Sequence, residues 1–344
     1  MADLVVLEKV SLAEHTTLKV GGTARYFITA TSEAEVAEAV QFAHERQLPL
    51  FVLGAGSNVL ASDGEYAGVV LNIRLLGKEA IVDESTNSVL FTVGAGEDLD
   101  TIIAHTVLSG WWGIENLSAI PSSIGAVPVQ NVGAYGVEAS QVIVSVRVYN
   151  GETKQIETWI ASQCAFAYRD SIFKHERGRQ AIVLAVTFRL SVTPTPHLSY
   201  KDLVEYFGDT TPTQAAIRAA IIAIRGKKFP DWRVVGTAGS FFKNPIIPST
   251  QAALLKEQYP ELPVYDTDTA DQKKVSLGYV LDKICHLKGY CDGPVCLYQE
   301  QALVLTVVPG TGADVVTAFA KKIAEKVFAT TNISIEWEVV LLSN

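Results

Sequence analysis

The spacing of apolar and polar residues predicts a helix and a buried strand near the start of the chain. Ser32 and Glu35 form a capping-box pattern, and apolar residues from Val36 to Ala43 then recur at helical spacing, which predicts a surface helix extending up to Pro49. The compact apolar run 50–53 predicts a buried strand. It leads directly into a glycine-rich turn at residues 54–58.

A second unit of the same kind follows. A strand ends in a Gly-Ala-Gly turn within residues 91–96, and Asp98 opens an amphipathic helix over 99–108. One recurrence is too few for a solenoid, which needs at least three units. Residues 116–136 carry little charge and have irregularly spaced glycines and prolines, so they predict a long, well-packed loop without a helix.

The remainder of the chain mixes strands and helices without strict alternation. Asn150-Gly151 predicts a hairpin between strands 142–149 and 154–159, because both residues tolerate positive φ. The further predicted elements are a strand at 181–190, a helix at 213–228, a loop up to Ser276, a helix from Ser276 to Gly289, a strand at 302–308, a helix carrying Val315, Phe319, Ile323 and Val327 on one face, and a strand at 333–342. This order favours α+β domains over a doubly wound sheet.

Composition narrows the class of protein. The 344 residues are 48% hydrophobic and 19% charged, which predicts a globular protein of two or three domains. The formal charge of −9 leaves no general basic field for nucleic acid or an anionic membrane. Apolar stretches are too short to span a bilayer, and the first residues lack the pattern of a secretory signal, so we expect a cytoplasmic protein.

The cysteines and histidines give no strong signal. Cys164, Cys285, Cys291 and Cys296 form no Cys-x-x-Cys pair, so we predict ordinary thiols. A zinc site is the alternative, but the last three cysteines lack finger spacing. The six histidines show no metal-ligand spacing and are interpreted as structural.

Two segments could bind anions. Gly54-x-Gly56 follows a strand, but Val59 stands where a dinucleotide fingerprint needs its third glycine, so the turn is either an anion nest or purely structural. The second segment contains one acid, Asp231, and five bases: Arg225, Lys227, Lys228, Arg233 and Lys243. It is the best candidate for an anion site in an acidic chain, and a solvated helix end is the alternative.

Single residues outside these segments could carry chemistry. Arg169 could bind a carboxylate through its planar fork, or could pair with Asp170. Ser240 stands before two phenylalanines, which places a hydroxyl beside apolar walls, although a buried structural serine is the default. Glu336 and Glu338 alternate with apolar residues, so one is a buried acid with a shifted pKa or both line the wet face of an edge strand.

Several motifs, taken in order, resemble the UDP-N-acetylenolpyruvoylglucosamine reductase family along nearly the whole chain. The motifs are TTLKVGGTA from Thr16, LGAGSNVL from Leu53, IPSSIGAVPVQNVGAYG from Ile120, YRDSIFK from Tyr168, AGSFFKNP from Ala238, QALVL from Gln301 and EV at Glu338. The segment around Tyr200 resembles the longer subclass, which has a substrate-covering loop. Ser122 stands where the family usually has glycine, and Val340 where it usually has arginine.

The resemblance implies an α+β fold with a two-domain flavin-binding half of the vanillyl-alcohol-oxidase (PCMH) type and a third, substrate-binding α+β domain. The expected boundaries are 1–78 and 79–229 for the flavin-binding subdomains, and 230–332 for the substrate-binding domain. The C-terminal strand 333–344 is expected to pack near the first subdomain.

The resemblance also implies an activity in cell-wall peptidoglycan synthesis. NADPH would reduce non-covalent FAD, and UDP-N-acetylglucosamine enolpyruvate would then occupy the same site and be reduced to UDP-N-acetylmuramate. Arg169 and Glu338 would stabilise the negative charge that develops on the substrate, the glutamate as a protonated hydrogen-bond donor, and Ser240 would donate the proton. We expect a monomer.

The resemblance assigns binding roles to further positions. The expected FAD contacts are Gly54, Ala55, Gly56, Ser57, Asn58, Val59, Pro121, Ser122, Gly125, Gln130, Asn131, Gly133, Ala134, Tyr135, Gly136 and Val183. The expected substrate contacts are Tyr135, Tyr200, Arg225, Lys228, Asn244 and Gln301. The alternatives are a FAD-dependent oxidase of the same superfamily and a nucleotide-binding regulator without activity, neither of which explains why Arg169, Ser240 and Glu338 occur together.

Overall fold

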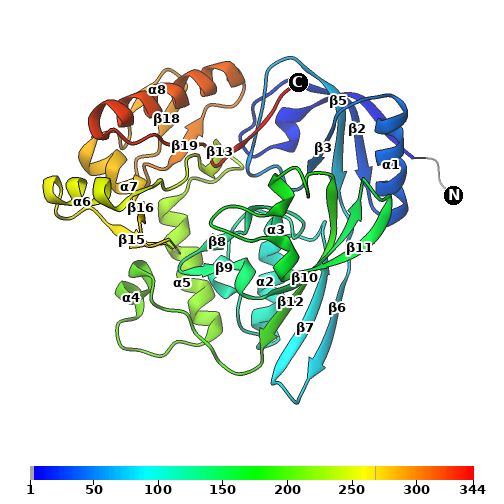
Figure 1. Cartoon of the computed structure of the whole chain (residues 1–344), viewed down its shortest axis with the longest axis horizontal. Helices are drawn as coiled ribbons and strands as arrows, with labels where there is room; N and C mark the ends of the chain where they lie inside the picture. Colours follow the sequence, from blue (N-terminus) through cyan, green and yellow to red (C-terminus); the bar gives the residue numbers. More distant parts are fainter. Residues whose placement is uncertain (1–3, 268) are drawn as a thin grey trace. The chain divides into compact units, whose positions relative to one another are not determined.

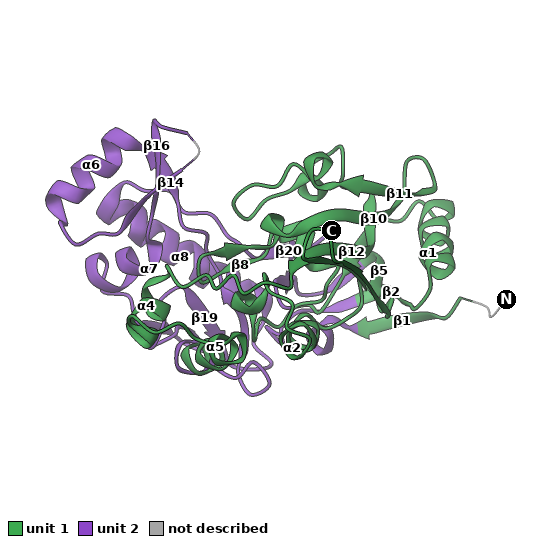
Figure 2. Cartoon of the chain, turned by 90° about the horizontal axis from the view of Figure 1, so that it is seen from below, with its two compact units in different colours: residues 1–10, 24–56, 67–225 green, residues 11–23, 57–66, 226–344 purple. Residues whose placement is uncertain are grey.

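The computed structural model describes residues 4–267 and 269–344. The chain forms two compact units, and each is assembled from separated parts of the sequence (Figure 2). Unit 1 comprises the described parts of residues 1–10, 24–56 and 67–225, and unit 2 comprises 11–23, 57–66 and 226–344. The expected boundaries of three domains stay a prediction, and residues 1–3 of the first lie outside the described residues.

Unit 1 is organised by a four-stranded sheet of order β1-β2-β5-β3 and a five-stranded sheet of order β11-β10-β12-β7-β6. Their strands are β1 (Val6–Ser11), β2 (Thr23–Ala30), β3 (Leu50–Leu53), β5 (Glu65–Ile73), β6 (Lys78–Asp83), β7 (Ser88–Gly94), β10 (Ile143–Asn150), β11 (Gln155–Ile160) and β12 (Ala181–Ser191). In the larger sheet β6 and β7 form a long hairpin (Figure 1). Central β12 buries alternate apolar side chains from Leu184 to Leu190 in the core of this unit.

Helices and short turns cover and connect these sheets. The helices are α1 (Glu33–Glu45), α2 (Leu99–Leu108), α3 (Ala126–Gln130), α4 (Lys201–Phe207) and α5 (Gln214–Lys228), the last continuing beyond Arg225 into unit 2. The 3-10 turns are Glu115–Leu117, Ala139–Gln141, Ala161–Cys164 and Ile172–Lys174, and a small hairpin joins β8 (Gly133–Ala134) to β9 (Val137–Glu138). Ser32 caps α1 in the predicted capping box, and Asp98 caps α2.

Unit 2 has its own apolar core, built around α8 and the β13-β19-β18-β17 sheet. Its strands are β4 (Val59–Ala61), β13 (Gly236–Ser240), β14 (Ile246–Pro248), β15 (Val264–Asp266), β16 (Gln272–Val275), β17 (Cys291–Asp292), β18 (Val295–Leu297), β19 (Val304–Val307) and β20 (Val340–Leu342). Its helices are α6 (Ser249–Gln258), α7 (Leu277–Tyr279) with a π-helical continuation Val280–Ile284, and α8 (Ala313–Thr331), and Leu12–His15 forms a 3-10 turn. The C-terminal strand β20 pairs in parallel with β4.

Most predicted helices and strands are confirmed, but several boundaries were wrong. The predicted loop 116–136 contains the short helix α3, and the loop before Ser276 contains α6 and four short strands. Helix α4 follows Tyr200 without having been predicted. The predicted helix up to Gly289 ends at Ile284. Helices α3 and α4 are five and seven residues long, so their apolar positions do not complete the two turns that make helical periodicity visible. The apolar residues of α6 form one contiguous run, 252–255, without helical spacing.

The hairpin at Asn150 forms, but with a different turn. Asn150 pairs with Gln155, so four residues form the loop instead of two. The side-chain oxygen of Asn150 accepts hydrogen bonds from the amides of Glu152 and Thr153, and Lys154 has the positive φ of 56°. The Asn150 side chain accepts hydrogen bonds from backbone amides inside the loop and thereby favours the four-residue turn.

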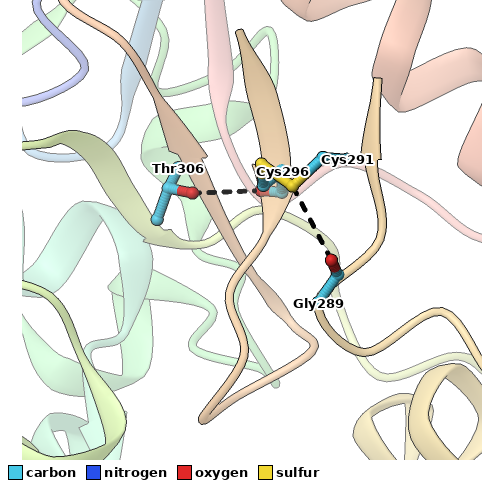
Figure 3. The surroundings of a disulfide bond; sticks show 4 residues. All are labelled: Gly289, Cys291, Cys296 and Thr306. Carbon is cyan, nitrogen blue, oxygen red and sulfur yellow. Dashed lines mark hydrogen bonds between the residues drawn. A yellow bond between two sulfur atoms is a disulfide. The ribbon is translucent and has the colours of Figure 1, made fainter. Parts of the chain in front are cut away.

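The prediction that all four cysteines are ordinary thiols was wrong. Cys291 and Cys296 lie opposite each other in the β17–β18 hairpin and form a disulfide (Figure 3). The Gly289 carbonyl oxygen lies 3.7 Å from Cys291 Sγ, and Thr306 donates to the Cys296 carbonyl. Cys164 and Cys285 are free. The spacing could not indicate this pairing, because hairpin register, and not sequence distance, brings the two sulfurs together.

Candidate active site

The glycine turn after β3 is packed tightly against the segment around Ser123. A Cβ atom on Gly54 would lie 2.3 Å from Ser123 Oγ, so no larger residue fits there. Gly56 has a positive φ of 66°, and a Cβ on Gly125 would lie 2.9 Å from the Cβ of Ala95. The absence of a side chain at Gly54 and Gly125 therefore lets these backbone segments pack closely against their neighbours.

Ser123 is a site candidate that the sequence analysis missed. The residue is 4% exposed, and its hydroxyl oxygen has no hydrogen-bond partner among the described residues. A buried hydroxyl without a partner costs stability, which makes it a candidate for contact with a ligand. The feature that marks Ser123 as a candidate is its position beside Gly54. This position is visible only in the three-dimensional structure.

The segment that holds Ser123 is fixed by main-chain hydrogen bonds. Ile124 donates to the Glu97 carbonyl, Gly125 donates to the Ala95 carbonyl, and the Ser122 carbonyl accepts from Leu99. The Ser122 hydroxyl donates locally to the Ser123 carbonyl at 3.2 Å, while the Ser122 carbonyl keeps its bond from Leu99.

Arg169 is held in a defined orientation within unit 1. Its Nη2 donates to the Gly133 carbonyl at 2.6 Å, and Lys174 Nζ donates to the Arg169 carbonyl at 2.7 Å. A Cβ on Gly133 would lie 2.9 Å from Arg169 Nη1, so this glycine makes room for the guanidinium. Arg169 has a positive φ of 53°, a conformation that side chains rarely adopt and that is frequent at functional sites.

Two side-chain hydrogen bonds link the Arg169 segment to the C-terminal end of α3. Buried Asn131 donates to the carbonyl of Ala167, and Ser171 donates to the carbonyl of Val129. The Asp170 carboxylate is 2.7 Å from His175 and accepts the amide hydrogen of Ser171. Three predicted residues, Asn131, Gly133 and Arg169, are therefore brought together although the sequence separates them.

A second cluster in unit 1 joins Tyr135, Tyr200 and Arg225. The rings of Tyr135 and Tyr200 meet edge to face at 5.2 Å. Tyr135 is hydrogen-bonded to Arg225, and burial raises the pKa of Tyr135 while that same bond opposes the rise. Burial lowers the pKa of Arg225, which also donates to the Ala119 carbonyl. Tyr135 packs on an apolar cluster with Trp112, Leu203, Ile217 and Ile221, which joins α4 to α5.

Asp100 connects this cluster to α2. Its carboxylate accepts two hydrogen bonds from Arg218, at 2.5 and 2.9 Å, and one from the Ala119 amide at 2.6 Å. Burial favours the neutral acid, but the bonds from Arg218 and Ala119, with the charge of Arg225, outweigh it and lower the pKa of Asp100. The carboxylate therefore stabilises the position of Ala119, to which Arg225 is also bonded.

In unit 2, Ser240 ends strand β13 and lies opposite Val304 of β19. Gly239 before it has a positive φ of 72°. The two following phenylalanines, Phe241 and Phe242, are buried, and Phe241 contacts Trp337 edge to face at 5.2 Å. The apolar wall expected beside the Ser240 hydroxyl stays a prediction.

Glu338 is held beside this segment, whereas Glu336 points into solvent. The Glu338 amide donates to the Phe241 carbonyl at 2.8 Å. The Glu336 side chain is 78% exposed and lies 3.5 Å from Lys243 Nζ. The expected continuous strand over 333–342 was wrong, because only Val340–Leu342 form β20 and Trp337 makes an isolated bridge with Phe242.

Two predicted substrate contacts of unit 2 meet at the start of α7. Asn244 accepts the Leu277 amide hydrogen at 2.9 Å. A Cβ built on Gly278 would lie 3.3 Å from Gln301 Oε1, which also accepts the amide hydrogen of Leu303. Asn244 therefore stabilises the N-terminal end of α7, near which Gln301 also lies.

Two bases of the predicted basic segment are paired with acids. Arg225 belongs to unit 1, and the other four bases belong to unit 2. Arg233 is paired with Asp231 at 2.9 Å, and Lys243 is paired with Glu336.

The other predicted FAD contacts occupy several environments. Val59 begins β4 and is 9% exposed, Val183 is 5% exposed in the core, and Gly136 has a positive φ of 83°. Three others, Ala55, Ser57 and Pro121, lie in loops, whereas Gln130 is the last residue of α3 and Ala134 belongs to β8. Among residues 4–267 and 269–344, no three His, Cys, Asp or Glu side chains gather as a metal site.

Comparison with known proteins decides the family. The chain matches the FAD binding domain family over residues 24–158 and the UDP-N-acetylenolpyruvoylglucosamine reductase C-terminal domain family over residues 231–342. A UDP-N-acetylenolpyruvoylglucosamine reductase of Cupriavidus pinatubonensis is 40% identical over 332 residues, covering 96% of this chain and 97% of that protein. The chain belongs to the UDP-N-acetylenolpyruvoylglucosamine reductase family. Its Pseudomonas aeruginosa relative is 38% identical over 97% of this chain and 98% of its own.

A solved structure supports the fold. The UDP-N-acetylenolpyruvylglucosamine reductase of Thermus caldophilus superposes with a TM-score of 0.69 at 21% identity, covering 98% of this chain and 99% of its own. The predicted α+β fold with a flavin-binding half of the vanillyl-alcohol-oxidase type is confirmed. No helix in the described part of the chain is both long and apolar enough to cross a membrane.

Proposed function

We propose that this chain is the flavoenzyme that reduces UDP-N-acetylglucosamine enolpyruvate to UDP-N-acetylmuramate, with NADPH as the electron donor, in peptidoglycan synthesis. Full-length similarity at 40% identity to a reductase of that name carries the proposal. The matched FAD binding domain supports the cofactor, and the matched C-terminal domain supports the substrate class.

Unit 1 contains a cradle suited to FAD. Gly54 and Gly125 leave no space for a side chain, and the partnerless Ser123 hydroxyl is available to a polar ligand. Main-chain N–H groups exposed at such a turn suit a diphosphate. Bound FAD supplies the two-electron chemistry that carries hydride from NADPH to the enolpyruvyl double bond.

Three residues of this chain would manage charge and protons during the reduction. Arg169, oriented by Gly133, would bind the substrate carboxylate through its fork. Glu338 would donate a hydrogen bond to the negative charge that develops when hydride reaches the terminal vinyl carbon. Ser240 would give its hydroxyl proton to the adjacent carbon, and the buried phenylalanines beside it would exclude water.

The remaining polar residues would bind the sugar nucleotide. Lys228 and Tyr200 would contact the diphosphate, and Tyr135 and Arg225 would form the wall behind it. The nucleotide sugar would contact the two side chains that meet at the start of α7, Asn244 and Gln301. The edge-to-face contact between Tyr200 and Tyr135 supports a role for the segment before α4 as a cover.

We also propose that NADPH and the sugar nucleotide use one site in turn and that the enzyme is a cytoplasmic monomer. Both ligands carry a diphosphate, which supports a shared site. Light scattering of the purified protein tests the monomer. A mass of one 37.2 kDa chain would support it, and twice that mass would contradict it.

The reaction is tested in two steps on purified holoenzyme. NADPH should bleach the flavin absorbance without oxygen, and UDP-N-acetylglucosamine enolpyruvate should restore it and yield UDP-N-acetylmuramate, identified by mass spectrometry. Fast recovery of the colour in air with no effect of the sugar nucleotide would instead indicate the oxidase alternative. Protein without any flavin absorbance would contradict both enzymes.

A further inference from the structure

The peptide groups at Glu338 are held from two sides within unit 2. The Glu338 amide donates to the Phe241 carbonyl at 2.8 Å, and the Glu338 carbonyl accepts from Asn58 Nδ2 at 3.1 Å. Phe241 directly follows Ser240 in the chain. The backbone of Glu338 is therefore fixed between the Ser240 segment and the residue that precedes β4.

Asn58 makes a second bond to the same segment. Its carbonyl accepts the Val340 amide hydrogen at 3.0 Å, just before the parallel pairing of β4 and β20 begins at Val59 and Val340. The side chain of Asn58 therefore adds a hydrogen bond at Glu338, two residues before the strand pairing begins at Val340. Between the two bonded positions, Val339 is 5% exposed, so its side chain is anchored in the core.

These contacts fix the backbone from which the Glu338 side chain extends. With amide, carbonyl and the following residue all fixed, the Cα–Cβ bond of Glu338 has little freedom to turn. Glu336 differs from Glu338 in exposure. Its carbonyl also accepts a main-chain hydrogen bond, from Lys243, but its side chain is 78% exposed.

We propose that Asn58 is a positioning residue for the acid Glu338, acting through its side-chain amide. This inference rests on the proposed function, in which Glu338 takes part in reduction of the sugar nucleotide. The role is separate from any contact of the Asn58 main chain with the cofactor. Loss of the amide donor would leave Glu338 in place but less well oriented.

The test uses two variants and a matched control. Asn58→Ala removes the donor, and Asn58→Asp keeps the size of the side chain but replaces the donor by an acceptor. Ser62→Ala is the control, because Ser62 Oγ donates to the Leu342 carbonyl at 3.1 Å, a bond of the same kind in the same strand pair. FAD content and circular dichroism verify the fold of each holoenzyme.

Rapid kinetics should separate the two half-reactions. We expect both Asn58 variants to slow reoxidation by the sugar nucleotide about tenfold, the value of one hydrogen bond, and to affect flavin reduction by NADPH less. Amide hydrogen exchange of peptides covering 336–340 should become faster in both. Ser62→Ala should leave both half-reactions unchanged.

A double-mutant cycle with Glu338→Gln decides the mechanism. If Asn58 acts through Glu338, Asn58→Ala should cost nothing further in the Glu338→Gln background. Four outcomes would overturn the positioning role alone. These are additive losses of the reoxidation rate in the double variant, an equal effect on both half-reactions, an equal effect of Ser62→Ala, and normal rates in both Asn58 variants. A normal reoxidation rate in Glu338→Gln would overturn the proposed role of Glu338, and the positioning role with it.

Discussion

At the scale of single residues, neighbours decide which of two similar groups is useful. Glu336 and Glu338 are two positions apart, but one side chain lies in solvent beside Lys243 and the other belongs to a residue bonded to Phe241 and Asn58. Ser240 directly precedes Phe241 and Phe242, which are both buried. Each role is therefore testable by removing one functional group.

Ser240→Ala removes the proposed proton donor. We expect NADPH to bleach the flavin at the normal rate and reoxidation by the sugar nucleotide to slow by about a hundredfold to a thousandfold, the typical effect of losing one transition-state donor. Stopped-flow absorbance measures both steps. Ser249→Ala, at the start of α6, serves as the control, and an unchanged second step in Ser240→Ala would refute the assignment.

Separate glutamine substitutions discriminate between the two acids. Glu338→Gln should slow the second half-reaction, because the acid acts there on developing charge. Glu336→Gln should leave turnover unchanged and alter the free energy of unfolding by less than about 1 kcal/mol, because its ion pair with Lys243 is exposed. Loss of turnover in Glu336→Gln alone would place the acid two residues earlier.

At the scale of elements, side chains tie helices to the loops that form the site. Asp100 of α2 joins Arg218 of α5 to the Ala119 amide, and Asn131 joins the end of α3 to the Arg169 segment. These bonds give fixed positions to loops that have little regular structure of their own.

The Asp100 contacts should make stability depend on pH. The pKa of Asp100 is lower in the folded protein than in the unfolded chain, so its contribution is complete above about pH 4, the ordinary value, and is lost as the pH falls below it. Asp100→Asn should destabilise the protein at pH 7 by about 1–3 kcal/mol, because Arg218 loses its partner. Urea unfolding at several pH values should show a weaker acid dependence in the variant. Equal slopes would contradict this account.

The Cys291–Cys296 disulfide predicts a definite thiol count. In denaturant without reductant, two of the four cysteines should react with an alkylating reagent, and mass spectrometry should identify them as Cys164 and Cys285. After reduction all four should react. Four reactive thiols before reduction would show that the hairpin is not cross-linked.

At the scale of the whole molecule, an acidic chain must bind anionic ligands. With a formal charge of −9, long-range attraction is absent, so binding depends on local bases and oriented main-chain groups. Unit 1 offers the glycine turn and Arg225, and unit 2 contains Lys228. The flavin diphosphate and the sugar nucleotide are expected to depend on different groups.

Lys228→Ala tests this separation. We expect a higher KM for the sugar nucleotide with unchanged FAD content, because the flavin diphosphate is assigned to main-chain N–H groups. Lys227→Ala, at the exposed neighbouring position, is the matched control. Added salt should weaken sugar-nucleotide binding more in the parent protein than in Lys228→Ala. Loss of FAD with unchanged kinetics would reverse the assignments.

The amino-acid sequence by itself determined the long helices, the hairpin at Asn150 and the family. A capping box at Ser32 and apolar periodicity along α8 are local signals, because neighbouring residues supply all the interactions that they describe. The motifs around Gly54, Arg169 and Ser240 also sufficed to recognise the family. The helices α3 and α4 were missed because elements of five and seven residues carry too little periodicity, and α6 was missed because its apolar residues form one contiguous run, 252–255.

Tertiary structure decided what depends on distant partners. The hydroxyl of Ser123 becomes notable only because Gly54, far away in the sequence, packs against it and leaves it without a partner among the described residues. Asn58 meets Glu338 across 280 positions, and Cys291 meets Cys296 through hairpin register. No local pattern encodes such contacts, because burial and orientation arise only when separate segments pack together.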